Sequence, residues 1–309
     1  MTGSPLASVG LIDEGAELEA TFVPGAGMIC SSLRHRGDEL LAQNAGLAAY
    51  AERGKTMGIP LLFPWANRLA GFEYRVAGRT VAVSHDTALV AVDDNGLPIH
   101  GVIGGRIAWE LTRPPGPEAQ SLAAQLSWSE AEPELFEVFP FRHDLEYEAR
   151  LADGRLEIEV TVHACGTDPV PLAFGFHPYL SLPGVPRERW HIELPAMRHE
   201  ALDARQIPVG PERTADAAEN FELAEREFDD GFDSVAEPAR FSVADAGRRI
   251  EFEFLRGYPC AQVFAPLAGQ FICFEPMTAP ANALRSGDGL QMLAAGERYS
   301  AAFSVHVKA

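Results

Sequence analysis

The chain alternates between apolar and polar residues in short runs along almost its whole length. Such runs, bounded by Gly, Pro and Asp, are typical of antiparallel strands with one buried face, whereas the spacing of an amphipathic helix is rare here. The clearest pair of runs is Asp144–Leu151 and Leu156–His163. Between them Asp153-Gly154 favours a tight turn, so this stretch predicts a β-hairpin.

A second hairpin is predicted from Ala239–Val243 to Arg249–Phe254. The polar stretch Ala201–Glu225 departs from the pattern and is expected to hold a short helix. Because the strands are spread evenly and no linker separates them, we expect one all-β, antiparallel domain over residues 1–309. The other predicted strands are Leu18–Phe22, Thr80–Val83, Ile103–Leu111, Leu122–Trp128, Gln262–Ala265, Gln270–Phe274 and Tyr299–Val307.

The composition is that of an ordinary globular protein, and it narrows the range of partners. Hydrophobic residues make up 47% of the 309 positions and charged residues 22%, which allows a large apolar core. The formal net charge of -19 repels nucleic acids and anionic membrane surfaces. We therefore expect a small-molecule ligand, and neither nucleic acid nor membrane as a partner.

The N-terminal segment and the cysteines favour a cytoplasmic location. Met1–Gly15 lacks the basic and apolar regions of a signal peptide, and no apolar stretch is long enough to span a membrane. Cys30, Cys165, Cys260 and Cys273 lie far apart in apolar surroundings, without a CxxC pair. We expect them to be buried, reduced thiols.

Two segments place one ionisable side chain among aromatic residues and prolines. The run Phe271–Glu275 reads as an apolar strand that ends at a carboxylate, which a proline follows. Glu275 is either a solvent-facing residue at the rim of a sheet or a general base held in place by that proline. His177 lies in a similar setting, between Phe176 and a proline. It is either a core histidine or a catalytic group whose protonation is set by burial and a nearby carboxylate.

Two earlier segments carry groups that bind hydroxyl-rich rings. Trp65, Asn67 and Arg68 offer an aromatic face, an amide and a guanidinium within four positions of each other. Trp65 is either a stacking platform or a core residue, and Arg68 is either a ligand contact or a salt-bridge partner. His100 is followed by Gly101, which permits close approach of the backbone and is typical of a pocket wall.

The sequence lacks the motifs that are typical of metal, nucleophile and nucleotide sites. His100, His177 and Glu275 together could suggest a metal, but they lie far apart, and no HExxH or HxH spacing occurs. No GxSxG nucleophile turn is present, and no GxGxxG or phosphate-binding loop. We therefore expect neither a metal nor a cofactor.

Four of these motifs, taken together and in this order, resemble the aldose 1-epimerase (galactose mutarotase-like) family. Each motif alone is weak, but the four together are specific, and the resemblance extends from about Gly25 to Gly296-Glu297. It implies a large antiparallel β-supersandwich with a sugar site on its concave face, in a monomer or a homodimer. The motifs are Gly58-Ile-Pro-Leu-Leu-Phe-Pro-Trp-Ala-Asn-Arg68, Ile99-His100-Gly101, Phe176-His177-Pro178-Tyr179 and Glu275-Pro-Met-Thr.

The resemblance also implies roles for individual residues. Glu275 falls on the family's general base and His177 on its general acid. The expected contacts to the sugar are Arg68, His100, Asn67, Trp65 and an aspartate in an Asp-x-x-Phe context, which Asp229 matches and for which Asp230 and Asp233 are close competitors.

The implied activity is that of an isomerase which interconverts the α and β anomers of a hexose by opening and reclosing the ring. A base must take the proton of the anomeric hydroxyl while an acid protonates the ring oxygen, so the two groups are expected on opposite sides of one C–O bond. An ordinary histidine is mostly neutral at pH 7. The site is therefore expected to raise the pKa of His177, with an acidic side chain or a backbone carbonyl within reach.

Two alternatives remain open at the level of sequence. The substrate of the same fold could be a hexose 6-phosphate, whose dianion would need several basic groups. Arg34, Arg36, Arg75 and Arg79 are candidates, although the overall acidity favours a neutral hexose. The second alternative is a non-catalytic sugar-binding protein, because stacking and hydrogen-bonding residues also serve binding without turnover.

Overall fold

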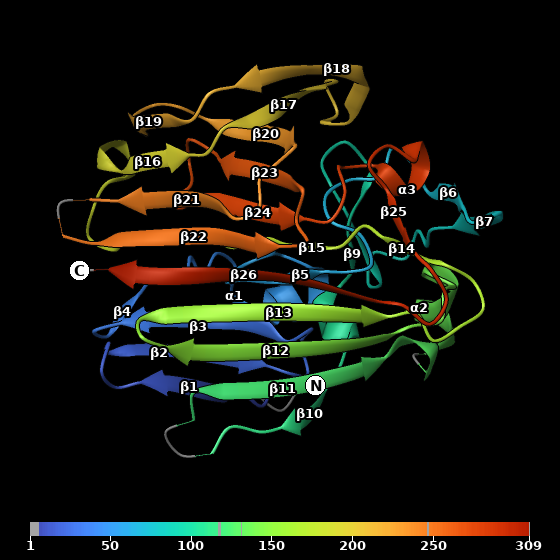
Figure 1. Cartoon of the computed structure of the whole chain (residues 1–309), viewed down its shortest axis with the longest axis horizontal. Helices are drawn as coiled ribbons and strands as arrows, with labels where there is room; N and C mark the ends of the chain where they lie inside the picture. Colours follow the sequence, from blue (N-terminus) through green and yellow to red (C-terminus); the bar gives the residue numbers. More distant parts are fainter. Residues whose placement is uncertain (1–5, 117–118, 131, 246, 309) are drawn as a thin grey trace.

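The computed structural model describes residues 6–116, 119–130, 132–245 and 247–308 (Figure 1). Strands dominate this part of the chain, and every pairing between them is antiparallel apart from two isolated bridges, so the all-β prediction is confirmed. No helix in the described ranges is long and apolar enough to cross a membrane.

The largest sheet has nine strands and contains both predicted hairpins. β12 and β13 pair from Asp144 opposite His163 to Ala152 opposite Arg155, and both turn residues, Asp153 and Gly154, have positive φ as this tight turn requires. In spatial order the strands are β10 (Glu110–Arg113), β11 (Ser121–Ser127), β12 (Asp144–Ala152), β13 (Arg155–His163), β26 (Arg298–Lys308), β22 (Arg249–Arg256), β21 (Ala239–Ala244), β16 (His191–Leu194) and β19 (Glu219–Glu222).

A second sheet has seven strands and packs against the first through aromatic side chains. The rings of Phe274 and Phe241 are stacked with centroids 5.2 Å apart, and those of Phe176 and Phe303 lie 4.9 Å apart. In spatial order its strands are β18 (Pro208–Asp216), β17 (Met197–Leu202), β20 (Phe228–Asp233), β23 (Cys260–Ala265), β24 (Cys273–Met277), β15 (Gly175–Phe176) and β5 (Leu61–Leu62).

Smaller elements cover the rest of the molecule. A four-stranded sheet lies behind the lower strands of the nine-stranded sheet in Figure 1, where Phe22 contacts Tyr147. Its strands are β1 (Val9–Asp13), β2 (Leu18–Val23), β3 (Ile29–His35) and β4 (Asp38–Glu39). The two-stranded sheets are β6 (Glu73–Val76) with β7 (Arg79–Ala82), β8 (Val90–Val92) with β9 (Pro98–Val102), and β14 (Val170–Leu172) with β25 (Gln291–Leu293). The helices are α1 (Gly46–Arg53), α2 (Pro133–Val138) and α3 (Ala283–Ser286), with 3₁₀ turns at Gly104–Arg106, Trp128–Glu130 and Arg187–Arg189.

Two predicted elements are wrong. The strand expected over Ile103–Leu111 is interrupted by a 3₁₀ turn, because Gly104 and Gly105 pack so closely on α1 that a Cβ at Gly105 would lie 2.0 Å from the carbonyl oxygen of Ala51. The helix expected within Ala201–Glu225 is absent from that range, whose backbone is described throughout and forms β18 and β19 instead. β18 and β19 lie at sheet edges, and most of the side chains described there are exposed, so these strands lack the alternation of a half-buried strand.

The cysteines follow the prediction at three of four positions. Cys30, Cys260 and Cys273 are buried free thiols. Cys165 is exposed, so its predicted burial is wrong. It follows the end of β13, where the chain leaves the sheet, and its thiol lies 3.3 Å from the hydroxyl of Ser129.

Candidate active site

Strand alternation brings the two expected catalytic residues to one face of the seven-stranded sheet. Phe274 on β24 and Phe176 on β15 point into the core between the two large sheets. Because successive side chains of a strand point to opposite faces, Glu275 and His177 point to the other face. β24 and β15 are neighbours in the sheet, so the two side chains meet there.

Glu275 and His177 are in direct contact. The Nε2 atom of His177 lies 3.3 Å from Oε1 of Glu275, and the two side chains are only 6% and 2% exposed. The expected acidic neighbour of the histidine is therefore present. The two groups lie side by side, and their expected placement about one C–O bond of a sugar stays a prediction.

Tyr179 fixes the orientation of the imidazole. Its ring is stacked on that of His177 with centroids 4.4 Å apart, and its hydroxyl oxygen lies 3.3 Å from Nε2. The same hydroxyl lies 2.5 Å from Oγ1 of Thr56. A ring held by stacking and by a hydrogen bond has little freedom to turn, so Nε2 stays directed at Glu275.

Burial decides the protonation of the pair. It raises the pKa of Glu275 well above the ordinary range; the charge of Asp229 adds to this and that of Arg68 opposes it. Burial also lowers the pKa of His177 well below its ordinary value, and His100 adds to the effect. The predicted rise in the pKa of His177 is therefore wrong, because a protonated neighbour does not offset the loss of water. Burial therefore favours the neutral form of both side chains.

Arg68 lies at the edge of this pair between two carboxylates. Its Nε donates to Oδ2 of Asp93 at 2.7 Å, and its Nη2 lies 3.7 Å from Oδ2 of Asp229. Burial alone would raise the pKa of Asp93, but hydrogen bonds from the Leu97 amide and from Arg68 outweigh it and lower that pKa. Partial burial raises the pKa of Asp229, against the pull of Arg68. Arg68 is thus both a salt-bridge partner and a cation next to Glu275.

Of the three competing aspartates, the structure brings Asp229 to the Arg68 side chain. Asp230 points to the opposite face of β20 and lies 3.0 Å from Nε2 of His199. Asp233 accepts two hydrogen bonds from Arg198 at the end of the strand.

Gln262 is a site residue that the sequence did not reveal. It stands directly opposite Glu275 in the pairing of β23 with β24. Its Nε2 donates to Oδ1 of Asp229 at 2.8 Å, and its Oε1 accepts from Nδ2 of Asn67 at 3.2 Å. Asn67 in turn accepts from the backbone N–H of Arg68 at 2.8 Å. Gln262 therefore links the aspartate to the Arg68 segment. It lies in an ordinary apolar run of a predicted strand, so only the strand register could have identified it.

His100 lies against His177 and is held by an unusual backbone. Its ring centroid is 5.3 Å from that of His177, and its φ is +63°, in the left-handed region. The N–H of His100 donates to the carbonyl of Asn67 at 2.9 Å, which ties β9 to the Arg68 segment. Burial, assisted by Arg68, lowers the pKa of His100 to about 3, so this imidazole is neutral.

Trp65 does not line the site. Its side chain belongs to the main hydrophobic core and is 1% exposed, so its ring has no face open to a ligand. The position of Trp65 in the structure matches the second interpretation of this residue, as part of the core.

No metal site is evident in the part of the chain that the structure describes, where no group of three or more His, Cys, Asp and Glu side chains has suitable geometry. The chemistry available at this face is that of proton transfer between a carboxyl group and an imidazole, next to a guanidinium and hydrogen-bonding amides.

The chain is similar to known proteins over nearly its whole length. A sequence model of the family described as aldose 1-epimerase matches residues 11–306, nearly the whole chain. The chain belongs to the aldose 1-epimerase family. Among curated relatives, the uncharacterized protein YihR of Escherichia coli strain K12 is 23% identical over 286 residues, which cover 86% of this chain and 89% of YihR.

Solved structures share the fold of this family member over its whole length. A galactose mutarotase-like protein of Clostridium acetobutylicum has a TM-score of 0.81 at 17% identity, with 98% of each chain covered. The Slr1438 protein of Synechocystis sp. PCC 6803 has a TM-score of 0.78 at 22% identity, with 100% of this chain and 98% of that chain covered. The chain therefore has the galactose mutarotase-like fold, as the sequence resemblance implied.

Proposed function

We propose that the protein is an aldose 1-epimerase that interconverts the α and β anomers of a neutral hexose. The observation that carries this proposal is the contact of 3.3 Å between His177 and Glu275. A carboxyl and an imidazole in contact, next to a cation and amides that bind hydroxyl groups, are what proton exchange on a sugar needs. The pair itself is only 6% and 2% exposed, so we expect a sugar to approach it over Arg68 and Asp229, whose side chains are 16% and 30% exposed.

The side-by-side arrangement suits the geometry of the anomeric carbon. The hydroxyl oxygen O1 and the ring oxygen O5 are bonded to the same carbon, C1, so two adjacent protein groups can face them together. Glu275 takes the proton of the O1 hydroxyl while Nε2 of His177 gives a proton to O5. The C1–O5 bond then breaks, and C1 becomes an aldehyde. Rotation about C1–C2 and reclosure, with both proton transfers reversed, give the other anomer.

One proton is sufficient for this cycle. We place it on Glu275 before the reaction, because burial favours the neutral forms of both groups. Its transfer along the contact to Nε2 of His177 gives a carboxylate and an imidazolium with no exchange with solvent. The positive charge of Arg68 favours the carboxylate form of Glu275. Oε2 of Glu275 is buried and makes no hydrogen bond to any residue in the described ranges, so a sugar hydroxyl would supply the partner that it lacks.

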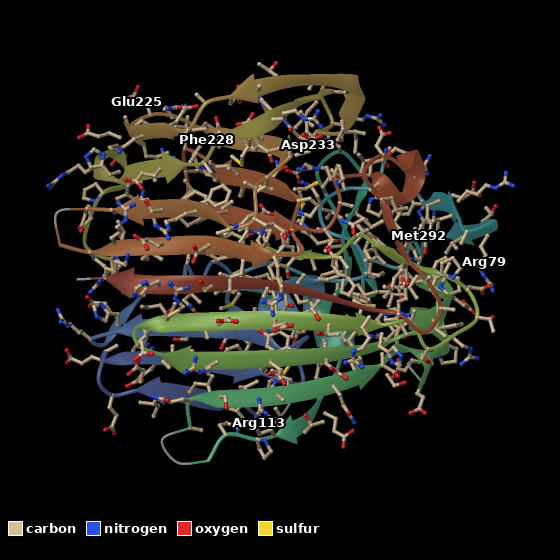
Figure 2. All side chains as sticks on the ribbon, viewed as in Figure 1. Arg79, Arg113, Glu225, Phe228, Asp233 and Met292 are labelled. Atoms are coloured by element: carbon tan, nitrogen blue, oxygen red, sulfur yellow. The ribbon has the colours of Figure 1, made fainter. Side chains whose placement is uncertain are left out.

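The surroundings of three of the four candidate arginines favour a neutral hexose over a hexose 6-phosphate. Arg34 pairs with Glu39, Arg36 with Glu17, and Arg79 with Asp168. Arg79 lies on β7, at the opposite side of the molecule from Phe228 on β20 in Figure 2. Paired and distant guanidinium groups do not form the cluster that a phosphate dianion needs.

Polarimetry on freshly dissolved sugars tests the proposed function. We expect the protein to accelerate anomerisation of α-glucose or α-galactose well above the rate in buffer, and glucose 6-phosphate to be a poorer substrate. Faster turnover of the phosphorylated sugar would favour the hexose-6-phosphate alternative. Sugar binding without any acceleration, and unchanged binding by Glu275→Gln, would favour the non-catalytic alternative.

The rate should be nearly constant across the neutral pH range. The pair is active while it holds one proton. It takes up a second proton only below the lowered pKa of His177, and it loses its only proton only above the raised pKa of Glu275. Initial rates measured from about pH 5 to about pH 9 should form a broad plateau. A narrow maximum between the ordinary values of 4.5 for Glu and 6.5 for His would contradict the shared-proton arrangement.

A further inference from the structure

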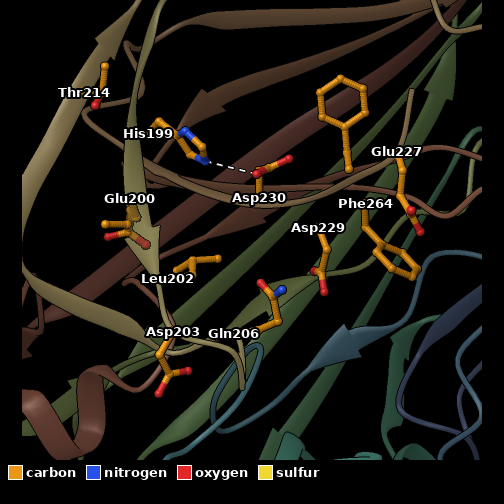
Figure 3. Close-up of a pocket in the computed structure, with 12 residues that line it drawn as sticks. His199, Glu200, Leu202, Asp203, Gln206, Thr214, Glu227, Asp229, Asp230 and Phe264 are labelled. Carbon is orange, nitrogen blue, oxygen red and sulfur yellow. Dashed lines mark hydrogen bonds and ion pairs between the residues drawn. The ribbon is translucent and has the colours of Figure 1, made fainter. Parts of the chain in front are cut away.

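The imidazole of His177 has different surroundings on its two sides. β17 and β20 are paired at two positions only and then separate, which leaves a hollow in the fork between them (Figure 3). Phe264 lines this hollow, and its ring lies edge-on to that of His177 with centroids 5.8 Å apart. Tyr179 covers one face of the imidazole instead, from inside the protein. The groups that contact Tyr179 can therefore act on His177 without meeting a ligand.

The Tyr179 side chain has little freedom to move away from the imidazole. Its ring is stacked on that of His177, lies edge-on to that of Phe271 with centroids 4.8 Å apart, and is buried. Burial raises the pKa of its hydroxyl well above the ordinary value, so this group stays a neutral phenol. The oxygen of the hydroxyl is therefore held in place, and only its hydrogen atom can turn.

The hydroxyl of Tyr179 lies between a second hydroxyl and the catalytic nitrogen. Its oxygen is 2.5 Å from Oγ1 of Thr56 and 3.3 Å from Nε2 of His177. A phenol has one hydrogen atom to donate, and its oxygen also accepts. Tyr179 can therefore donate to only one of these two partners at a time, and it presents a lone pair to the other.

Backbone contacts hold Thr56 next to Tyr179, although 123 positions separate the two residues in the sequence. Nδ2 of Asn44 donates to the carbonyl of Thr56 at 2.9 Å. The carbonyl of Gly58, two residues further on, accepts from the N–H of Tyr179 at 2.8 Å. Gly58 packs so closely on β3 that a Cβ there would lie 2.5 Å from the carbonyl oxygen of Cys30. The segment that carries Thr56 is thus tied both to Tyr179 and to a neighbouring sheet.

The two hydroxyls have one hydrogen-bond arrangement for each protonation state of His177. When Nε2 carries no proton, Tyr179 donates to it and Thr56 donates to Tyr179. When Nε2 carries a proton, the lone pair of the Tyr179 oxygen faces Nε2, and the phenol donates to Thr56. The two arrangements differ only in the rotation of O–H bonds, so no covalent bond forms or breaks. In neither of them is the buried phenol left without an acceptor.

We propose that Thr56 is a positioning residue that acts through Tyr179: its hydroxyl accepts the phenol hydrogen when His177 is protonated, and the pair of hydroxyls thereby stabilises the imidazolium. This inference rests on the proposed function, in which the imidazolium gives a proton to O5 of the sugar. Burial lowers the pKa of His177, and His100 and Arg68 add to the effect. An oxygen lone pair directed at Nε2 offsets part of that cost.

The test removes one hydroxyl at a time and keeps the packing. Thr56→Val replaces the hydroxyl by a methyl group, Thr56→Ser keeps the hydroxyl, and Tyr179→Phe keeps the stacked ring. Thr80→Val, at an exposed threonine on β7, is the matched control. Polarimetry on the hexose that the wild-type protein turns over fastest gives kcat and KM for these variants and for the double variant Thr56→Val/Tyr179→Phe.

We expect Thr56→Val to lower kcat about tenfold, which corresponds to ~1.4 kcal/mol, and to leave KM within about twofold, because Thr56 acts on the catalytic proton and not on the sugar. Thr56→Ser should restore kcat, and Thr80→Val should not change it. Tyr179→Phe should also lose about tenfold, and the double variant should lose no more than Tyr179→Phe alone.

Three results would overturn the proposal while the proposed function stands. They are an unchanged kcat in Thr56→Val, equal losses in Thr56→Val and Thr56→Ser, and losses that multiply in the double variant. Equal losses would assign the effect to packing of the methyl group, and multiplied losses would show that Thr56 does not act through Tyr179.

Nitrogen NMR separates this inference from the proposed function, because it needs no turnover. The resonance of Nε2 of His177 depends on the hydrogen bond that this atom makes with the Tyr179 hydroxyl. It should move in Thr56→Val and in Tyr179→Phe, and it should return to the wild-type position in Thr56→Ser. If it does so while no sugar is turned over, the hydroxyl pair stands and the epimerase function fails. A resonance that Thr56→Val leaves in place would overturn the hydroxyl pair.

Discussion

Replacing Glu275 by Gln is expected to lower kcat for anomerisation by about 10³-fold. Gln preserves the size of the side chain and can still donate a hydrogen bond, but its amide cannot accept the proton of the O1 hydroxyl. Loss of a positioned general base or acid costs about 10²–10⁴-fold. Polarimetric rates for the variant and the wild-type protein at the same pH measure the effect. A kcat within about threefold of wild type would contradict the role of Glu275.

Folding should be unaffected by this change. Burial raises the pKa of Glu275 well above its ordinary value and so favours the neutral carboxyl, which a neutral amide replaces. The free energy of unfolding from urea titration should therefore stay within about 1 kcal/mol of wild type. Glu222→Gln, at an exposed position on β19, is the matched control and should change neither rate nor stability. Equal losses of activity in both variants would indicate a general effect on the fold.

Gly101→Ala is expected to destabilise the protein by about 3 kcal/mol or more. Two costs add: the new methyl group clashes with neighbouring atoms, and the backbone at this position has a conformation that is unfavourable for alanine. A Cβ at this position would lie 2.1 Å from the carbonyl oxygen of Phe63 and 2.8 Å from the nitrogen of Pro64. Both are backbone atoms, which cannot move aside as a flexible side chain can. The φ of +70° adds the cost of a left-handed conformation for alanine.

Gly96→Ala separates these two costs. Gly96 lies in the loop that joins β8 to β9, has a similar φ of +74°, and has nothing within 4 Å of the position of its Cβ. It should lose only about 1 kcal/mol. Urea denaturation of both variants measures the difference, which isolates the contact between Gly101 and Phe63. Equal losses in the two variants would show that this close approach does not matter. Because Gly101 follows His100, its variant should also lower the rate.

The local pattern of the sequence was sufficient where a strand has one face in the core. The β12–β13 hairpin follows from alternation and from an Asp-Gly turn, both of which are properties of a few adjacent residues. The alternation of apolar and polar residues did not predict the polar edge strands β18 and β19, because a strand with little burial has no apolar face. It also failed at Gly104-Gly105, where packing against a distant helix ends the strand.

The motifs around Glu275, His177, Arg68 and His100 could be recognised from the sequence because each is a short, unusual combination of residues. The link through Gln262 could not, because it depends on the register of β23 against β24. The place of Trp65 in the core likewise depends on how remote segments pack.

The sequence by itself determined the all-β class, the family and the residue types that carry the chemistry. Each of these depends on short patterns of adjacent residues, which can be read without knowing how the chain folds. Only the tertiary structure decided that Glu275 and His177 touch, and that burial favours the neutral forms of both. It also opened the fork between β17 and β20. Contact, burial and strand separation arise between segments far apart in the sequence, and the free energy of a charge depends on the water that those segments exclude.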